Sequence, residues 1–301
     1  MTKLKKNIIK AYRYISSTHR WSLMYKGVFD EKYIDIRQPD DLSRADSFIV
    51  EFGGKIYIFF EEWVTGLNAK GYLSVGELDI DKNELINVHK ILEKKYHLSY
   101  PFVFKYKNEW YLVPETHQNG SIVLYKFTEF PYKLKKVKTL IDNINAADTT
   151  LTIKDNTVYL FTNIKEHGKS HHDNLSLFYC DDLLNDNFKS HPMNPIKTDS
   201  RFSRMAGNIL TENSRLYRYA QDCSISYGDC MYKFEIIDLS RDNYEEKMIE
   251  TLLKPSKCVS SHTFSKSKNF IVIDVIYRVR YIAQVFTNIA NLFKMASKYF
   301  K

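Results

Sequence analysis

A single pattern recurs five times along this sequence, and its copies begin about 50 to 57 residues apart. Each copy has a small or polar opening, an apolar stretch, a polar turn and an aromatic-rich stretch that ends in polar or acidic residues. The copies read RADSFIVEFGGKIYIFFEE from Arg44, LSYPFVFKYKNEWYLVPET from Leu98, AADTTLTIKDNTVYLFTN from Ala146, SRMAGNILTENSRLYRYAQD from Ser203 and VSSHTFSKSKNFIVIDVI from Val259. Because apolar runs on both sides of a short turn are typical of β-hairpins, we expect five hairpins in succession.

Four further apolar stretches supply additional strands: GYLSVGELD from Gly71, SIVLYKFTE from Ser121, NLSLFYCDD from Asn174 and DCMYKFEIID from Asp229. The composition also favours β-structure, because 22 Tyr and 19 Phe stand against 10 Gly and 7 Pro. Repeats of this length with four strands each are typical of β-propeller blades. We therefore predict an all-β fold, a five-bladed β-propeller over residues 20–276. The alternative is a β-sandwich of similar hairpins.

The openings of the innermost strands matter for function, because in a propeller they line the central funnel and their side chains converge on its axis. In this sequence the openings carry Asp46, Tyr100, Asp148, Arg204 and His262. The second strands end in Glu61, Glu62, Glu115, Asn163, Asp222 and Asp274. We therefore expect a funnel lined by carboxylates and other polar groups.

Several motifs in these hairpins resemble a known group of propellers. They are RADSF at 44–48, SYPFVFKYKNEWYLVPET at 99–116, AADTTL at 146–151, HPMNPIKTDSRFSRMAG at 191–207, LYRYAQDCSISYG at 216–228 and HTF at 262–264. The chain resembles the five-bladed clan of arabinanases, β-xylosidases, levansucrases and invertases. More closely, it resembles the N-terminal domain of glucosamine inositolphosphorylceramide transferase and related bacterial surface-polysaccharide proteins. The resemblance covers nearly the whole predicted propeller.

The resemblance to the hydrolases implies roles for two aspartates. In that clan an Asp opening the first blade is the base or nucleophile and an Asp opening the third blade tunes the acid, and Asp46 and Asp148 match these positions. The general acid is a Glu opening the fourth blade, but the matching stretch here, SRFSRMAG, has no carboxylate. Glu115 could replace it from the end of blade 2. Because glycoside hydrolysis needs two carboxyl groups, this difference argues against the usual hydrolytic route. The alternative role for both aspartates is hydrogen bonding between blades.

Basic residues near the missing acid suggest a different leaving group. Arg201, Arg204 and Arg218 suit a phosphate or diphosphate, because guanidinium groups bind phosphate oxygens in pairs and stay charged. The alternative is that they pair with Asp199, Asp222 or Asp229. The predicted catalytic residues are Asp46, Asp148 and Glu115, and the predicted substrate-binding residues are Glu62, Tyr100, Arg201, Arg204, Arg218, Asp222 and His262.

These observations predict a glycosyltransferase-like enzyme of bacterial surface polysaccharide (capsule or lipopolysaccharide) biosynthesis. Its expected partners are an activated sugar donor and a glycan or lipid-linked acceptor. The alternatives are a glycoside hydrolase of the arabinanase or xylosidase type and a non-catalytic carbohydrate-binding propeller. No cofactor and no metal are expected: the histidines of HGKSHHDN at 167–174 fit a solvated loop better than a metal site, and four irregularly spaced cysteines fit reduced thiols.

Both ends of the chain lie outside the predicted blades and are basic. We predict a basic helix over residues 1–19 and an amphipathic, cationic helix over residues 277–301 that binds an anionic membrane surface. The alternative for the second is a helix packed against the propeller or a partner chain. The net charge of +8 comes without a recognised nucleic-acid-binding module, and no signal peptide or long apolar run is present. The expected location is cytoplasmic, at the inner face of the membrane.

Overall fold

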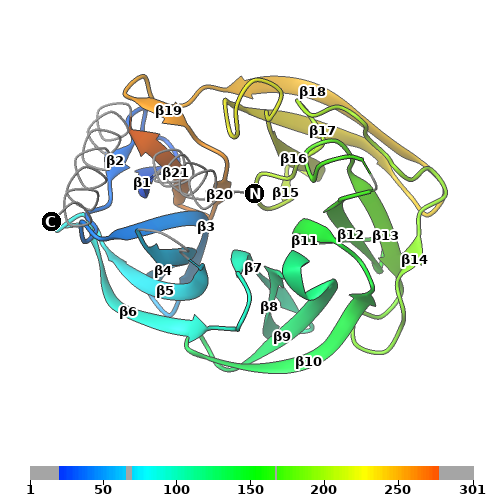
Figure 1. The fold of residues 1–301 in the computed structure, drawn as a ribbon, viewed down its shortest axis with the longest axis horizontal. Helices are drawn as coiled ribbons and strands as arrows, with labels where there is room; N and C mark the ends of the chain where they lie inside the picture. Colours follow the sequence, from blue (N-terminus) through cyan, green and yellow to red (C-terminus); the bar gives the residue numbers. More distant parts are fainter. Residues whose placement is uncertain (1–19, 66–69, 167, 278–301) are drawn as a thin grey trace, which may run out of the picture.

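The computed structural model describes residues 20–65, 70–166 and 168–277. These residues form five antiparallel β-sheets arranged as blades around a central axis (Figure 1). The prediction of an all-β, five-bladed propeller is therefore confirmed. The predicted helix at residues 1–19 lies outside the described residues, as does the one at 277–301 except for Tyr277, which ends the last strand.

Blades 1 to 3 each consist of four consecutive strands. Blade 1 contains β3 (Leu42–Phe52), β4 (Lys55–Val64), β5 (Tyr72–Asp79) and β6 (Glu84–Leu92). Blade 2 contains β7 (Ser99–Tyr106), β8 (Glu109–Glu115), β9 (Ser121–Glu129) and β10 (Lys133–Asp142), with the 3₁₀ helix η1 (His117–Asn119) between β8 and β9. Blade 3 contains β11 (Ala146–Lys154), β12 (Thr157–Ile164), β13 (Ser176–Cys180) and β14 (Lys189–Ser190).

The ring closes in blade 5, which combines strands from both ends of the described chain. Blade 4 contains β15 (Leu210–Glu212), β16 (Arg215–Gln221), β17 (Met231–Leu239) and β18 (Tyr244–Leu252). Blade 5 contains β19 (Cys258–Ser260), β20 (Phe264–Lys266), β21 (Phe270–Tyr277), β1 (Trp21–Gly27) and β2 (Ile34–Asp35). Strand β1 pairs with β21 along its whole length, from Trp21 opposite Ile276 to Gly27 opposite Phe270. This pairing joins the first and last strands without a covalent link.

The hairpin turns explain why the inner strands pair in the observed register. In blade 1 the turn Gly53-Gly54 has positive φ angles of 60° and 75°, and Phe52 lies opposite Lys55. Positive φ at both central residues matches the twist of the flanking strands and so favours a two-residue hairpin. The turns at 107–108, 155–156 and 213–214 likewise have positive φ at both residues. The prediction of hairpins at 53–54, 107–108 and 155–156 is confirmed.

Gly207 holds blades 4 and 5 together at the axis, and its replacement should be costly. It has φ of 132°, and a Cβ atom there would lie 1.9 Å from the carbonyl oxygen of Phe264. We expect Gly207→Ala to lower the free energy of unfolding by about 2–3 kcal/mol, because both the backbone angle and the close approach disfavour a side chain. Urea unfolding measures this. Gly120→Ala is the control, since Gly120 has φ of 67° but no atom within 4 Å of its Cβ position; an equal loss in both variants would contradict this explanation.

Candidate functional site

Three of the predicted funnel residues share one backbone feature. Asp46, Tyr100 and Asp148 all have positive φ, at 53°, 46° and 50°. Each lies at a register shift in the pairing of the inner strand with the second strand of its blade. Non-glycine residues rarely adopt this conformation, which costs roughly 1–2 kcal/mol. The same bulge therefore recurs in blades 1 to 3 and gives these three side chains equivalent positions near the axis.

Side chains at the ends of second strands accept hydrogen bonds from backbone N–H groups at these openings. The backbone N–H of Asp46 donates to Asp274 Oδ2 at 2.9 Å, and that of Asp148 donates to Glu115 Oε2 at 3.2 Å. In blade 4 the N–H of Met205 donates to Asn163 Oδ1 at 3.0 Å. Each hydrogen bond connects neighbouring blades. The alternative role considered for Asp46 and Asp148, hydrogen bonding between blades, is also seen: Asp46 accepts the Tyr100 N–H of blade 2, and Asp148 accepts a hydrogen bond from Gln221 of blade 4.

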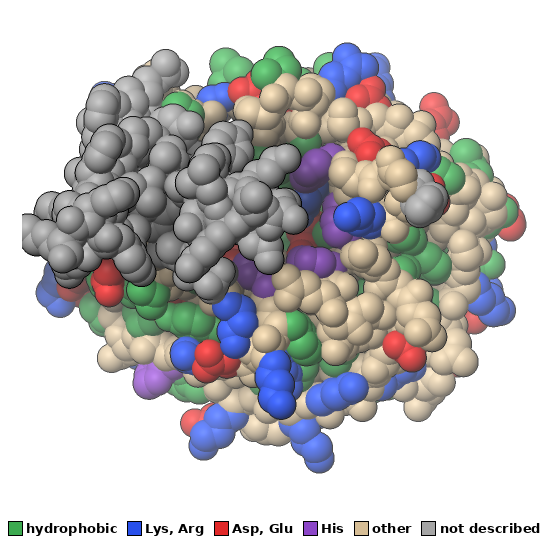
Figure 2. Space-filling model, viewed as in Figure 1, with side chains coloured by type: hydrophobic (Ala, Val, Ile, Leu, Met, Phe, Trp, Pro, Cys, Tyr) green, Lys and Arg blue, Asp and Glu red, His purple; other side chains and the backbone are tan. Residues whose placement is uncertain are grey.

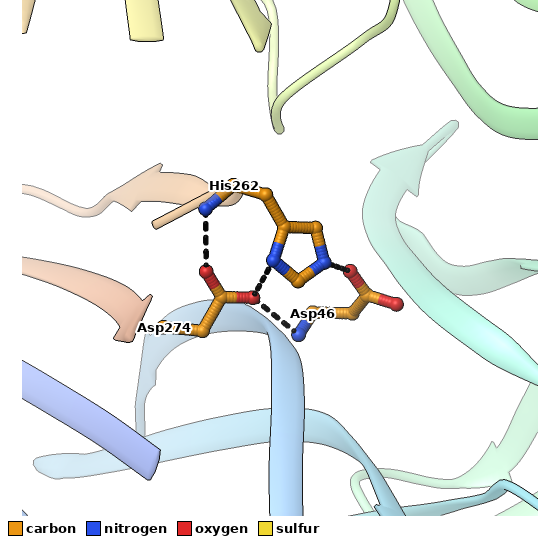
Figure 3. Close-up of side chains that lie close together, drawn as sticks. All are labelled: Asp46, His262 and Asp274. Carbon is orange, nitrogen blue, oxygen red and sulfur yellow. Dashed lines mark hydrogen bonds and ion pairs between the residues drawn. The ribbon is translucent and has the colours of Figure 1, made fainter. Parts of the chain in front are cut away.

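Asp46 belongs to a buried triad with His262 and Asp274 (Figure 3). His262 Nε2 lies 2.8 Å from Asp46 Oδ1, and its Nδ1 lies 3.0 Å from Asp274 Oδ2. The Nδ1 contact is a close charge contact rather than a well-aligned hydrogen bond. Burial opposes protonation of this imidazole, but Asp274 and Asp46 outweigh that effect and raise the pKa of His262 to about 10. The triad therefore contains a histidinium between two carboxylates.

The same triad is the one cluster of the described residues whose ligand atoms could surround a metal ion, since they lie within 4.8 Å of one another. A histidine binds a metal ion only through a ring nitrogen that carries no proton. Here each ring nitrogen of His262 already contacts a carboxylate, and Asp274 also accepts the backbone N–H groups of His262 and Thr263, both at 2.9 Å. The arrangement is that of a histidinium paired with two carboxylates, with one net negative charge.

Arg204 forms the second centre of the funnel. Its Nε donates to Asp148 Oδ2 at 2.6 Å, and one of its terminal nitrogens lies 3.7 Å from Glu115 Oε2. The other terminal nitrogen lies 3.2 Å from His172 Nδ1. Gln221 also donates to Asp148 Oδ2, at 3.2 Å. A guanidinium from blade 4 therefore joins the carboxylates that open blade 3 and end the second strand of blade 2.

The two carboxylates beside Arg204 differ in their acidity. Burial favours a neutral Glu115, but His117 and Arg204 outweigh it and lower the pKa of Glu115 well below its usual range. Burial raises the pKa of Asp148 well above its usual range, opposed by Arg204 but reinforced by Glu115 and Asp46. Since each carboxylate affects the pKa of Asp148, we infer that they share one electrostatic environment. Asp46 and Asp148 occupy equivalent bulges on the innermost strands of blades 1 and 3, and their joint action on one sugar stays a prediction.

A further acid, Glu61, ends the second strand of blade 1 and contacts His97. Glu61 Oε1 lies 3.1 Å from His97 Nε2, and Gly71 N–H donates to His97 Nδ1 at 3.0 Å. Glu61 raises the pKa of His97 to about 9 against the effect of burial, but the Gly71 hydrogen bond requires an unprotonated Nδ1. We assign the neutral tautomer with its proton on Nε2, because a protonated Nδ1 would face the Gly71 N–H.

Imidazole and aromatic rings form the rim of the funnel, and Figure 2 shows histidines gathered around the central hollow with acidic side chains deeper in it. Their ring centroids are 5.5 Å apart for His117 and His171, and 5.7 Å for His172 and Tyr227. Burial, reinforced for His172 by Arg204, lowers the pKa of both His171 and His172 to about 4, so both are neutral at pH 7. The described part of this histidine segment is a loop, as predicted, but His171 and His172 are half-buried in it rather than fully solvated.

Two predicted substrate-binding arginines do not contribute to this centre. Arg218 is 0% exposed and binds Glu246 through two hydrogen bonds of 2.7 Å within blade 4, so it cannot contact a ligand. The Arg201 guanidinium is exposed and bound by Asp199, with the shortest contact at 2.6 Å. The surface pairing considered as an alternative is therefore correct for Arg201, and the predicted pocket of three arginines is reduced to Arg204.

Two predicted acids are also structural. Glu62 points away from Glu61 on the same strand and forms a buried ion pair of 2.7 Å with Arg44. Asp222 accepts hydrogen bonds from Ser224 and from the Tyr232 hydroxyl. Both carboxylates are therefore occupied by neighbours within their own blades. The prediction that they bind substrate is not supported by these contacts.

Tyr100 is buried and connects blade 2 to blade 1, to blade 3 and to the segment that leads into blade 4. Its N–H donates to Asp46 Oδ2 at 3.1 Å, and its hydroxyl lies 2.8 Å from Thr150 Oγ1. The same hydroxyl accepts the N–H of Gly207 at 2.9 Å. With 1% of its surface exposed, Tyr100 supports the floor of the funnel rather than contacting a ligand.

Comparison with known proteins places the chain in a family. Residues 31–283 match the family described as glucosamine inositolphosphorylceramide transferase 1, N-terminal. The chain belongs to this family. The Oryza sativa subsp. japonica glucosamine inositolphosphorylceramide transferase 1 is 31% identical over 219 residues, which is 71% of this chain and 29% of the rice protein. The Arabidopsis thaliana member is 29% identical over 217 residues, covering 71% and 28%. This chain thus spans less than a third of the length of these relatives.

Solved structures with the same fold include glycoside hydrolases. The Coprinopsis cinerea α-L-arabinofuranosidase catalytic domain is similar at a TM-score of 0.54 and 12% identity, over 87% of this chain and 98% of that domain. A B. megaterium levansucrase variant matches at a TM-score of 0.54 and 12% identity, over 78% of each chain. At this identity the likeness shows the fold alone. Both resemblances expected from the sequence, to the transferase family and to the hydrolase clan, are confirmed at that level.

The one helical element in the described part of the chain is the three-residue η1, so no helix there is long and apolar enough to cross a membrane. The predicted contact with an anionic membrane surface depends on residues 277–301, which lie outside the described residues apart from Tyr277. That contact, and the bacterial polysaccharide setting, stay predictions.

Proposed function

We propose that this chain binds a phosphate-activated sugar in the funnel and takes part in transferring that sugar to a hydroxyl acceptor. The observation that carries the proposal is the unequal distribution of charge around the axis. Asp46 of blade 1 is paired with His262, whereas Arg204 lies between Asp148 of blade 3 and Glu115 of blade 2 and also contacts the neutral imidazole of His172. The names of the plant relatives, glucosamine inositolphosphorylceramide transferases, agree with a transfer reaction.

Each of these two centres suits one half of a glycosyl transfer. The bond between the anomeric carbon and its leaving group breaks through a state with positive charge on the sugar ring, which fixed carboxylates such as Asp46 stabilise. The leaving phosphate gains negative charge and needs no proton. Arg204 and a neutral imidazole N–H are suitable donors to its oxygens. The absence of a carboxyl group at the opening of blade 4 then follows naturally, because Arg204 occupies that position.

The proposal predicts release of nucleotide from an activated hexosamine. We expect the protein to bind a uridine diphosphate hexosamine saturably, with free inositol as a soluble acceptor, and to release UDP. Asp46→Asn should reduce the rate of UDP release by about 10²–10³-fold, because a fixed charge beside the reacting centre contributes on that scale. Donor affinity should stay within a few-fold. A coupled assay of UDP and calorimetric titration of the donor measure the two quantities.

Other results would support the alternatives. Rapid release of sugar from aryl glycosides, abolished in Glu115→Gln, would contradict transfer and favour a glycoside hydrolase. Saturable binding of sugars without turnover of any donor would favour a carbohydrate-binding propeller. The second outcome has one structural argument in its favour, because most funnel carboxylates already accept hydrogen bonds from the protein.

A further inference from the structure

The funnel carboxylates differ in how fully the protein satisfies them. Asp46 accepts the Tyr100 N–H on one oxygen, and its other oxygen contacts His262 and the Thr263 hydroxyl, at 2.8 Å and 3.1 Å. The other carboxylates are equally engaged: Asp148 by Arg204 and Gln221, Glu115 by His117 and the Asp148 N–H, and Asp274 by the N–H groups of Asp46, His262 and Thr263. A carboxylate held by several donors is a weak base, since each donor stabilises its ionised form.

Glu61 is the exception. Within the described parts of the chain, the polar contact of its carboxylate is with His97 Nε2, on Oε1. Glu61 pairs with Ala45 at the opening of blade 1, just as Glu115 pairs with Ser99 at the opening of blade 2. Glu115 accepts the N–H of the next blade's bulge, but in blade 2 the corresponding N–H, that of Tyr100, donates to Asp46 instead. Oε2 of Glu61 can therefore accept a further hydrogen bond, whereas Oε2 of its counterpart Glu115 already accepts the Asp148 N–H.

We propose that Glu61 is the general base of the transfer reaction and that His97 positions it. This inference rests on the proposed function. The acceptor oxygen forms a bond to the anomeric carbon while the bond from that carbon to the phosphate oxygen breaks, and its electron pair leaves with the phosphate. The hydroxyl proton passes to Glu61 Oε2 and then to solvent. His97 keeps its Nε2–H on Oε1 throughout.

The surroundings of Glu61 suit this role. Burial raises its pKa to about 7, with Asp46 and Glu115 adding to the effect and His97 opposing it. A base is most effective when its pKa is near the working pH, because it is then both available and strong enough to accept a proton. Three titratable groups act on the pKa of Glu61: His97 from the loop before β7, Asp46 from β3 and Glu115 from β8.

The local backbone also fixes Glu61 in place. A Cβ atom at Gly71 would lie 2.2 Å from Glu61 Oε1 and 2.5 Å from the carbonyl oxygen of Leu98. The start of β5 therefore packs against the carboxylate, and Gly71 donates its N–H to His97 Nδ1 from the same place. One backbone segment thus sets both the orientation of the imidazole and the position of the acid that it contacts.

The test compares Glu61→Gln with the unmodified protein on transfer to inositol. We expect the transfer rate to fall by about 10²–10⁴-fold, the usual contribution of a general base, with unchanged donor affinity. Azide, which attacks as an anion and has no proton to lose, should restore nucleotide release in Glu61→Gln and yield the glycosyl azide. Glu109→Gln, an exposed acid on β8, is the matched control and should behave as the unmodified protein.

His97→Phe tests the positioning role through the pH profile. Because His97 lowers the pKa of Glu61, its removal should move the acid limb of the transfer rate from near pH 7 to higher pH, and His89→Phe on β6 should leave the limb in place. Transfer by Glu61→Gln at the normal rate and with the normal pH profile would overturn the assignment of the base while leaving the proposed function intact. Failure of the unmodified protein to bind or cleave any activated sugar would instead reject the proposed function, and with it the role of Glu61 in transfer.

Discussion

Replacing Arg204 with alanine should lower the free energy of unfolding by about 3–5 kcal/mol. Removing one partner of a buried ion pair leaves the remaining charge without compensation in a medium of low polarity. Here Arg204 is the positive charge beside two buried acids, Asp148 at 2.6 Å and Glu115 at 3.7 Å, and all three side chains are at most 11% exposed. Urea unfolding followed by far-ultraviolet circular dichroism measures the loss.

Arg201 provides a matched control three positions earlier in the same loop. Its side chain is 55% exposed and pairs with Asp199 at the surface. Because exposed ion pairs contribute little, Arg201→Ala should unfold at nearly the same urea concentration as the unmodified protein. Equal losses in the two variants would show that the loop, and not the buried charge cluster, explains the effect. A stable Arg204→Ala protein would mean that water enters the funnel and solvates the two carboxylates.

The contrast between these two arginines also shows where the sequence prediction reached its limit. Strand openings were predictable, because alternating apolar residues and turn residues define each hairpin, and so Asp46 and Asp148 were assigned correctly to the innermost strands. Residues 191–207 form a long connection without strand periodicity. Nothing in such a segment distinguishes an arginine that faces the axis from one that faces solvent. The difference between Arg201 and Arg204 therefore required the structure.

A different reason applies to Glu61 and Glu62. Adjacent residues on a strand point to opposite faces, so only one of them can face the funnel. The choice depends on register: Glu61 lies opposite Ala45, whereas Glu62 lies opposite Arg44 and pairs with it. The bulge at Asp46 shifts this register, and a bulge is difficult to place from one sequence. The sequence analysis selected Glu62 for this reason, although Glu62 pairs with Arg44 and it is Glu61 that contacts His97.

The free energy of unfolding should also depend on pH through His262. Its folded-state pKa is about 10, above the value of about 6.5 for an unfolded histidine. The stabilisation from its protonated form is therefore complete below about pH 6.5 and is lost as the pH rises through about 10. We expect the free energy of unfolding to fall by about 1 kcal/mol per pH unit between pH 7 and 10, and by about 3–5 kcal/mol in total. Urea unfolding at a series of pH values measures the slope.

Two comparisons connect this slope to the triad. His262→Gln should unfold more easily at pH 7 but lose most of the pH dependence, because glutamine cannot carry the charge that the carboxylates of Asp46 and Asp274 stabilise. His89→Gln, on the exposed outer strand β6, should keep the slope of the unmodified protein. If His262→Gln does not fold, the imidazole can be observed directly in the unmodified protein by ¹⁵N NMR. Titration of His262 near pH 6.5 in the folded protein would contradict the assignment, since an imidazole held between two buried carboxylates must retain its proton well above that pH.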